Sequence, residues 1–289
     1  MDTEKIRAFL CVLECGTISG AAEKLGYTTS GISRLIASLE ADAGFSLLKR
    51  NHNGVVATDE CQTLIPAMEE LIRSAERYEQ LTASVRGLEI GSVTIGTAYS
   101  AYYRPLAGIV ASFTKEHPGI RVQIVEGTSS QLNEMLSNHN VDLCIISHRP
   151  GVSRWMPLIQ NELMALVARD HPSVAEGCFP STRFSEEPFI ELYPGRETDN
   201  SLFFEDAGIK PNTRFSTYDV IAGVAMVEAG LGVSLSNNLW DDSLTGSVAA
   251  LRLDPPVKID IGLATPPLDM VAPAVRCFIK YIERSLSVL

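Results

Sequence analysis

Apolar residues recur every three or four positions near the start of the chain and predict three short helices. The first covers residues 1–15 and ends at Gly16, and its apolar positions are Ile6, Phe9, Leu10 and Leu13. The second lies between Thr17 and Gly26. The third ends near Gly44, and its apolar positions are Ile32, Leu35, Ile36 and Leu39. At about 100° per residue, its opposite side carries Ser30, Ser33, Arg34 and Ala37.

A β-hairpin and a long helix are predicted next. The apolar pairs Leu47-Leu48 and Val55-Val56 flank residues 51–54, which end in Asn-Gly, the strongest short hairpin signal. Thr58 is placed to cap a helix that runs to about Leu88.

The apolar positions of this long helix alternate in steps of three and four residues, which is the spacing of a coiled coil. They are Cys61, Leu64, Met68, Leu71, Ala75, Tyr78, Thr82 and Val85. Pro66 lies inside the predicted helix and should kink it. The helix either packs along its own domain or pairs with a partner helix, and its length of about 45 Å favours the partner.

From Gly91 onward, short apolar runs alternate with helical patterns. Strands are predicted at 93–95, 120–125 and 141–146, with helices at 104–116 and 129–138 between them. Further on, strands are predicted at 163–169, 189–192, 213–215, 233–235 and 259–264, with helices near 199–207, 218–229 and 273–286. This order predicts mostly parallel sheets in two α/β lobes separated by a cleft. Ligands bind such sheets at the carboxyl ends of the strands.

Composition narrows the functional classes. Of the 289 residues, 45% are hydrophobic and 20% are charged, as in a globular protein of two domains. No apolar run reaches the roughly 18 residues of a membrane span. The N-terminus lacks the pattern of a secretory signal, so we expect a cytoplasmic protein with no membrane partner. The six cysteines are scattered without a C-x-x-C pair, so we expect neither disulfides nor a metal site.

The net charge of −11 argues against non-specific coating of nucleic acid. Residues 1–60 carry 6 basic and 8 acidic side chains and are therefore nearly neutral. Residues 89–289 carry 15 basic and 23 acidic side chains, so most of the acid lies in the C-terminal part. Any DNA contact near the N-terminus must come from local placement of charge.

Three helices followed by a hairpin predict a winged helix-turn-helix, whose third helix lies in the major groove of DNA. The segment resembles the DNA-binding signature of the LysR-type transcriptional regulators over about 60 residues. The matching positions are Ile6 to Phe9, Gly16 to Ala22, Leu25, Ile32 to Arg34, Leu39, Glu40, Gly44, Leu47, Arg50 and Thr58. Asp142-Leu143 and the run from Glu228 to Val233 fit the same family. The chain departs from it at Ser30-Gly31, where a Gln-Pro-like pair is usual.

The resemblance implies a fold and a domain order. The fold class is α/β multidomain, with a winged helix-turn-helix at 1–58, a dimerisation helix at 59–89 and an effector-binding domain at 90–289. The last domain resembles periplasmic binding proteins, with lobe I at 91–162 and 266–289 and lobe II at 163–265. The implied partners are double-stranded DNA, a small-molecule effector and further copies of the chain, as a homodimer or homotetramer.

Six residues are candidates for DNA contact. Arg34 can donate two hydrogen bonds to a guanine, although it could instead contact phosphate or pair with Glu40 or Asp42. Thr29, Ser30 and Ser33 lie on the same helix and can reach bases or phosphates. Lys49 and Arg50 of the hairpin are expected to bind phosphate.

Two hydroxyl-rich segments are candidates for effector binding. Tyr99, Ser100 and Tyr102 follow the first strand of lobe I, and Thr128 and Ser130 follow the second. Hydroxyls and free N–H groups at helix starts bind anions, although Ser and Thr there can equally be ordinary caps. Facing strand ends contribute Ser147 and Tyr193. We therefore expect a small carboxylate, and Tyr99 and Tyr102 as walls favour an aromatic one.

Other functional classes have weaker support. The sequence contains no G-x-S-x-G, no H-E-x-x-H and no phosphate-binding loop, so we expect no catalytic residues and no cofactor. The main alternative is a cytoplasmic small-molecule sensor without a DNA-binding role. Such a sensor has no use for a recognition helix and a hairpin wing, so residues 1–60 distinguish the two.

Overall fold

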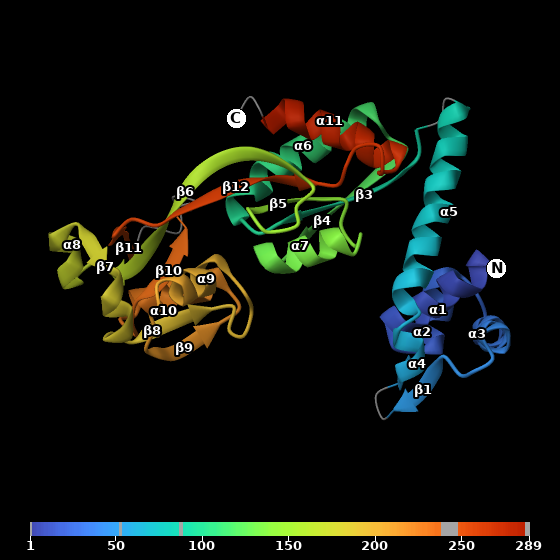
Figure 1. Cartoon of the computed structure of the whole chain (residues 1–289), viewed down its shortest axis with the longest axis horizontal. Coiled ribbons are helices and arrows are strands. Elements are labelled where there is room, and N and C mark those ends of the chain that lie inside the picture. Colours follow the sequence, from blue (N-terminus) through green and yellow to red (C-terminus); the bar gives the residue numbers. More distant parts are fainter. Residues whose placement is uncertain (1, 52–53, 87–88, 238–247, 287–289) are drawn as a thin grey trace. The chain divides into compact units, whose positions relative to one another are not determined.

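The chain forms two compact units in the computed structural model, Met1–Leu88 and Glu89–Leu289 (Figure 1). The structure describes residues 2–51, 54–86, 89–237 and 248–286. Across these residues, no helix combines the length and the apolar character needed to cross a membrane.

The first unit is a winged helix-turn-helix followed by a longer helix. Its elements are α1 (Thr3–Cys15), α2 (Ile18–Leu25), α3 (Thr29–Ala43), β1 (Leu48–Asn51), β2 (Gly54–Ala57), α4 (Asp59–Gln62) and α5 (Ile65–Val85). Ile32, Ile36 and Leu39 of α3 are buried against Phe9 and Val12 of α1, as the apolar spacing predicted. The hairpin is confirmed as an antiparallel pair, and residues 52 and 53 of its turn lie outside the described residues.

Hydroxyl caps and one close backbone approach fix the angles of these elements. Thr17, Thr28 and Thr58 cap α2, α3 and α4, each by accepting a hydrogen bond from a backbone N–H of the first turn. At the wing, the N–H of Val55 donates to the carbonyl of Gly16 at 2.9 Å. A Cβ on Gly54 would lie 2.2 Å from that carbonyl oxygen, and its φ of 134° also excludes most side chains.

The single helix predicted from 59 to 88 is wrong, because two helices cover this part. The first, α4, ends at Gln62 with Thr63 as its C-cap, and α5 begins at Ile65. Pro66 therefore lies in the first turn of α5, where its missing N–H breaks no helical hydrogen bond, and it does not kink a helix interior.

The two ends of α5 have different surroundings. Near its start, Met68 and Leu71 are half-buried against the core of the first unit. Near its end, Tyr78 is 71% exposed, Leu81 46% and Val85 89%. The coiled-coil spacing thus describes one helix that packs on its own unit first and then presents an apolar surface.

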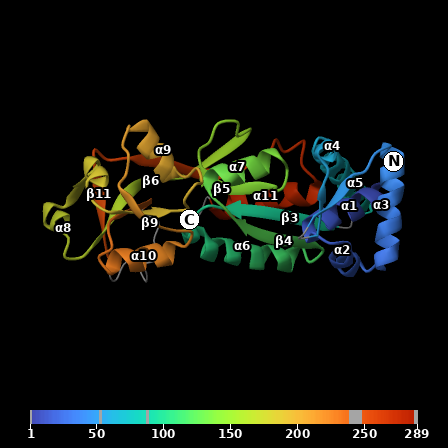
Figure 2. The same cartoon turned by 90° about the horizontal axis from the view of Figure 1, so that it is seen from below.

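The first lobe of the second unit is a sheet with helices on both faces (Figure 2). Its elements are β3 (Gly91–Thr97), η1 (Ser100–Tyr102), α6 (Tyr103–Glu116), β4 (Ile120–Glu126), α7 (Ser129–Ser137), β5 (Leu143–Ser147) and α11 (Pro273–Leu286). Alternate residues of β5 point to opposite faces: Leu143 and Ile145 pack with α6 and α11, and Cys144 and Ile146 with α7. The parallel order β4-β3-β5 brings the carboxyl ends of these strands to one edge.

The second lobe continues this sheet and adds a separate parallel pair of strands. Its elements are β6 (Arg154–Ala168), α8 (Pro172–Glu176), β7 (Cys178–Pro180), η2 (Ser181–Ser185), β8 (Phe189–Leu192), α9 (Asp199–Asp206), β9 (Thr213–Thr217), α10 (Val220–Glu228), β10 (Ser234–Asn237), β11 (Val248–Asp254) and β12 (Lys258–Thr265). Strand β6 pairs with β12 through its first half and with β10 and β11 through its second, so it runs from one lobe into the other.

The lobe boundary differs from the expectation at β12. We placed residues up to 265 in lobe II, but Ile261 and Leu263 pack in the first-lobe core. The reason is that β12 pairs with β5 as well as with β6. The strand predicted at 163–169 also starts earlier, at Arg154, and β7, β11 and α8 were not predicted.

Candidate DNA-binding face and effector cleft

The side of α3 opposite its apolar positions is exposed, as the spacing predicted. Thr29, Ser30, Ser33 and Arg34 are all exposed there. The hydroxyl of Ser33 donates to the carbonyl of Thr29 at 2.9 Å within the helix. Thr28, one residue before the helix, is an N-cap and accepts from the N–H of Gly31 at 3.1 Å.

Arg34 differs from most basic residues of this unit in its surroundings. Within the described part of the chain it makes no hydrogen bond or ion pair. The two acids considered as its partners are engaged elsewhere: Glu40 accepts from the N–H groups of Leu47 and Leu48, and Asp42 pairs with Lys5 at 2.8 Å. Its guanidinium is therefore available to a ligand.

The wing contributes one described cation. Lys49 is exposed and pairs with Asp59 at 2.7 Å, and this ion pair lowers the pKa of the Asp59 carboxyl. Solvent screens an exposed pair of this kind strongly, so a phosphate can replace Asp59. Arg50 belongs to β1, but its side chain lies outside what the structure describes.

A cavity of about 970 Å³ lies between the two lobes. Four of the predicted effector residues line it: Tyr99, Ser100, Thr128 and Tyr193. Three of them follow strands β3 and β4, whose carboxyl ends meet at the same edge, and Tyr193 follows β8 of the second lobe. Thr128 also caps α7 through a capping box with Gln131, so the capping alternative applies to it as well.

The other three predicted residues lie elsewhere. Ser130 and Ser147 do not line the cavity but take part in polar contacts between the lobes. Tyr102 packs against the first-lobe core, and its predicted contact with an effector stays a prediction. It ends the short helix η1, and the next residue, Tyr103, lines the cavity in its place.

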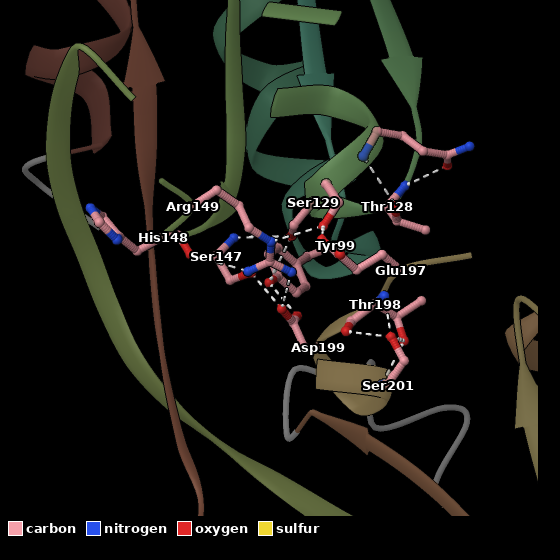
Figure 3. Close-up of polar contacts among 12 residues, drawn as sticks. Tyr99, Thr128, Ser129, Ser147, His148, Arg149, Glu197, Thr198, Asp199 and Ser201 are labelled. Carbon is pink, nitrogen blue, oxygen red and sulfur yellow. Dashed lines mark hydrogen bonds and ion pairs between the residues drawn. The ribbon is translucent and has the colours of Figure 1, made fainter. Parts of the chain in front are cut away.

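A buried carboxylate network joins the two lobes (Figure 3). Asp199, the first residue of α9, accepts hydrogen bonds from Arg149 Nη2 at 2.8 Å, the Ser147 hydroxyl at 2.5 Å and the Tyr99 hydroxyl at 2.9 Å. The side chains of Arg149 and Asp199 are only 8% and 13% exposed. All three donors belong to the first lobe, and Asp199 belongs to the second.

The network is well packed on the first-lobe side. Arg149 Nη1 donates to the Ser147 hydroxyl at 2.6 Å, and the N–H of Ser147 donates to the Ser129 hydroxyl at 3.1 Å. Burial and the Asp199 carboxylate raise the pKa of Tyr99 well above its usual range. Tyr99 therefore keeps its proton and remains a hydrogen-bond donor.

Two more exposed contacts flank this network. Arg196 Nη1 donates to Gln131 Oε1 at 3.1 Å, and the Ser130 hydroxyl donates to Glu197 at 2.5 Å. Residues 196–199 of the second lobe thus bridge to the start of α7 and to the end of β5. We name these four residues the bridging segment.

The rest of the cavity lining includes aromatic and charged residues. Tyr103, Tyr193 and Tyr218 line it together with Glu126, Asp219 and Arg104. Burial and the nearby Glu126 raise the pKa of Tyr103 to about 12. Tyr193 has a φ of 58°, which is uncommon for a residue other than glycine and concentrates at functional sites.

Sequence reasoning missed the two central residues of the network, Arg149 and Asp199. Arg149 lies two residues after Ser147 and just beyond the carboxyl end of β5, where ligand-binding residues concentrate. That position was a usable signal. Asp199 follows the N-cap Thr198, where an acidic residue is ordinary, so the sequence offered no distinguishing signal for it.

One group of potential metal ligands occurs among the described residues, outside the cleft. Glu89, His117 and Cys277 place their ligand atoms within 4.8 Å of one another. His117 Nδ1 is hydrogen-bonded to Glu89, and its ring also packs against Phe113. These contacts account for the group as an ordinary surface cluster of the first lobe.

Family models match nearly the whole chain. Residues 86–287 match the LysR substrate binding domain, and residues 3–62 match the bacterial regulatory helix-turn-helix protein, lysR family. The chain belongs to the LysR family. It is therefore a transcriptional regulator that joins a DNA-binding helix-turn-helix to an effector-binding domain, as the sequence predicted.

Individual relatives of this LysR-type regulator match it over most of its length. An uncharacterized HTH-type transcriptional regulator, YvbU, of Bacillus subtilis is 26% identical over 97% of both chains. The activator CmpR of Synechocystis is 23% identical over 86% of this chain and 84% of its own.

Solved structures share the fold. Full-length OxyR C199D of Pseudomonas aeruginosa has a TM-score of 0.70 at 18% identity, over 99% of this chain and 94% of its own. Full-length CbnR in complex with its target DNA has a TM-score of 0.63 at 21% identity, over 99% and 100% of the two chains.

Proposed function

We propose that this LysR-type regulator reads its operator with α3 and contacts the DNA backbone with the wing. The observation that carries the proposal is the exposed guanidinium of Arg34, which has no partner among the described residues, on the face opposite the apolar positions of α3. A bidentate arginine–guanine contact needs such a side chain. Thr29, Ser30 and Ser33 supply further polar contacts, and Lys49 and Arg50 neutralise phosphates. Because its target is DNA, its place of action is the cytoplasm, and no catalytic role is part of the proposal.

The effector is a small molecule with a carboxylate and an aromatic body. Four predicted residues line the cleft, and the four tyrosines in its lining, Tyr99, Tyr103, Tyr193 and Tyr218, combine an apolar ring with a polar tip. The carboxylate of Asp199 supports the choice of ligand, because it accepts hydrogen bonds from Arg149, Ser147 and Tyr99, and a ligand carboxylate could accept the same bonds.

The assembly is a dimer, or a tetramer built from dimers. Tyr78, Leu81 and Val85 expose apolar surface on the second half of α5, where another copy of the helix would bury it. A two-fold dimer presents two copies of α3 to a two-fold related DNA site.

A gel-shift titration tests the proposal. The full chain is mixed with the upstream region of its own gene and, separately, with a shuffled fragment of equal length and composition. A regulator binds the upstream fragment at least about 10³-fold more tightly than the shuffled one. Equal, weak binding to both fragments would favour the sensor without a DNA-binding role.

A further inference from the structure

We infer that Asp199 acts as a built-in competitor of the effector and occupies the carboxylate-binding site of the first lobe. This inference rests on the proposed effector function and extends it to regulation. It starts from the placement of a second-lobe carboxylate among first-lobe donors, with Arg149 at 2.8 Å, Ser147 at 2.5 Å and Tyr99 at 2.9 Å.

The donors form a complete receptor for one carboxylate. Arg149 brings a full positive charge, and the two hydroxyls bring neutral hydrogen bonds, of which the Tyr99 proton is retained because its pKa is raised by burial and by Asp199. Ser129 holds this arrangement through the N–H of Ser147. The receptor is therefore built in one lobe and filled by the other.

Asp199 lies between the receptor and the open cavity. It lines the cavity, whereas Arg149 does not. Among the described residues, the cavity therefore presents the carboxylates of Glu126, Asp199 and Asp219 beside one cation, Arg104. A free carboxylate entering this space meets repulsion until Asp199 leaves, and only then does it reach the guanidinium of Arg149.

Departure of Asp199 would separate the lobes locally. Asp199 is one end of the bridging segment, whose Arg196 and Glu197 reach Gln131 and Ser130 on the first lobe. A ligand that takes the place of Asp199 keeps Arg149 satisfied while releasing this attachment. The ligand then binds the released arrangement more tightly than the bridged one, which is the condition for shifting an equilibrium between them.

Chemical rescue tests the exchange directly. Asp199→Ala removes the carboxylate and leaves a space beside Arg149. Acetate, a small free ion that carries a carboxylate, can fill this space. We expect about 0.1 M acetate to raise the Tm of Asp199→Ala by about 3 °C more than it raises the Tm of the wild type. Acetamide, the neutral analogue of the same shape, should give no extra shift, and Arg149→Met added to Asp199→Ala should abolish the rescue.

Asp219→Ala is the matched control. Asp219 lines the same cavity but caps α10 by accepting from the N–H groups of Ile221 and Ala222. Its removal deletes an equal charge without touching Arg149, so acetate should not rescue it. Equal rescue of both variants, rescue by acetamide, or no rescue of Asp199→Ala would overturn the inference. If Asp199→Ala does not fold, Asp199→Asn takes its place with benzoate as the probe.

Three probes of similar size, namely benzoate, benzyl alcohol and benzylamine, then identify which ligand charge the cavity prefers. We expect benzoate to bind Asp199→Asn about tenfold more tightly than the wild type, because the competing carboxylate is gone. Benzyl alcohol should show no such gain. Binding of benzylamine in preference to benzoate would overturn the inference and assign the cavity to a cation at Glu126 and Asp219. The gel shift described above does not involve Asp199, so failure of DNA binding and failure of the exchange are separate results.

Discussion

The guanidinium of Arg34 and the ammonium of Lys49 lie in different environments, and this difference sets different expectations for DNA binding. Arg34 has no partner within the described residues, whereas Lys49 must exchange Asp59 for a phosphate. A base contact carries sequence preference, and a phosphate contact carries salt dependence.

Arg34→Ala should weaken operator binding by about 1–3 kcal/mol and relax the preference at one base position in each half-site. Lys49→Ala should weaken binding to all sequences alike and reduce the slope of log K against log salt by about 1 for each lysine lost. Fluorescence anisotropy with base-substituted operators at several salt concentrations measures both. If Arg34→Ala keeps wild-type affinity and base preference, α3 is not the reading helix.

Thr128 combines a cap with a place in the cavity wall, and a pair of substitutions can separate the two roles. Thr128→Val removes the oxygen that accepts from Gln131 and should cost about 1 kcal/mol of stability. Thr128→Ser keeps the hydroxyl and should leave stability nearly unchanged. Benzoate titrations then isolate the ligand role: affinity should fall in Thr128→Val and persist in Thr128→Ser. Equal affinity in both variants would reduce Thr128 to a cap.

At the scale of elements, α5 changes surroundings along its length, and this changes which residue reports on assembly. Leu71 is half-buried against its own unit. Leu71→Glu should therefore lower the free energy of unfolding of that unit by about 2 kcal/mol, and its effect is not limited to dissociation of the dimer. Tyr78 is 71% exposed, so Tyr78→Glu should leave the helix folded and bury a carboxylate from each copy in the proposed dimer interface. Light scattering with circular dichroism distinguishes the two. A stable Tyr78→Glu dimer of wild-type mass would place the interface elsewhere.

Elements with a strong local pattern were predictable, and those that depend on distant partners were not. Ile32, Ile36 and Leu39 identify the buried side of α3 by spacing alone. The first half of β6 escaped prediction because Pro157 interrupts its pattern, and its strand conformation is fixed by pairing with β12, about 100 residues later. The break between α4 and α5 was likewise not predicted, because a proline is compatible either with a kink inside one helix or with the first turn of a new helix.

The candidate site shows the same limit. Tyr99, Ser100 and Thr128 were predictable because strand ends and helix starts are visible in the sequence. The role of Asp199 was not predictable, because it depends on the contact with Arg149, 50 residues away, which forms only where the second lobe meets the first.

At the scale of the whole molecule, charge is distributed unevenly between the DNA-binding and effector-binding parts of the chain. Residues 1–60 are nearly neutral and residues 89–289 carry a net charge of −8, from 15 basic and 23 acidic side chains. At physiological salt the Debye length is about 8 Å, so distant charges are screened. The acidic side chains of residues 89–289 therefore weaken DNA binding far less than direct contacts strengthen it. The regulatory signal must instead pass through the arrangement of the two lobes.

Asp199→Asn should imitate the effector in its influence on DNA. If the effector acts by displacing Asp199, the variant already lacks the ion pair that links Asp199 to Arg149 across the lobes. Its operator complex without any ligand should then match that of the effector-bound wild type. Gel mobility and nuclease footprints of the operator complex measure this, with Asp219→Asn as the control that keeps its helix cap and should resemble the unliganded wild type. A ligand that alters the wild-type footprint while Asp199→Asn retains the unliganded footprint would mean that the signal leaves the cleft by another route.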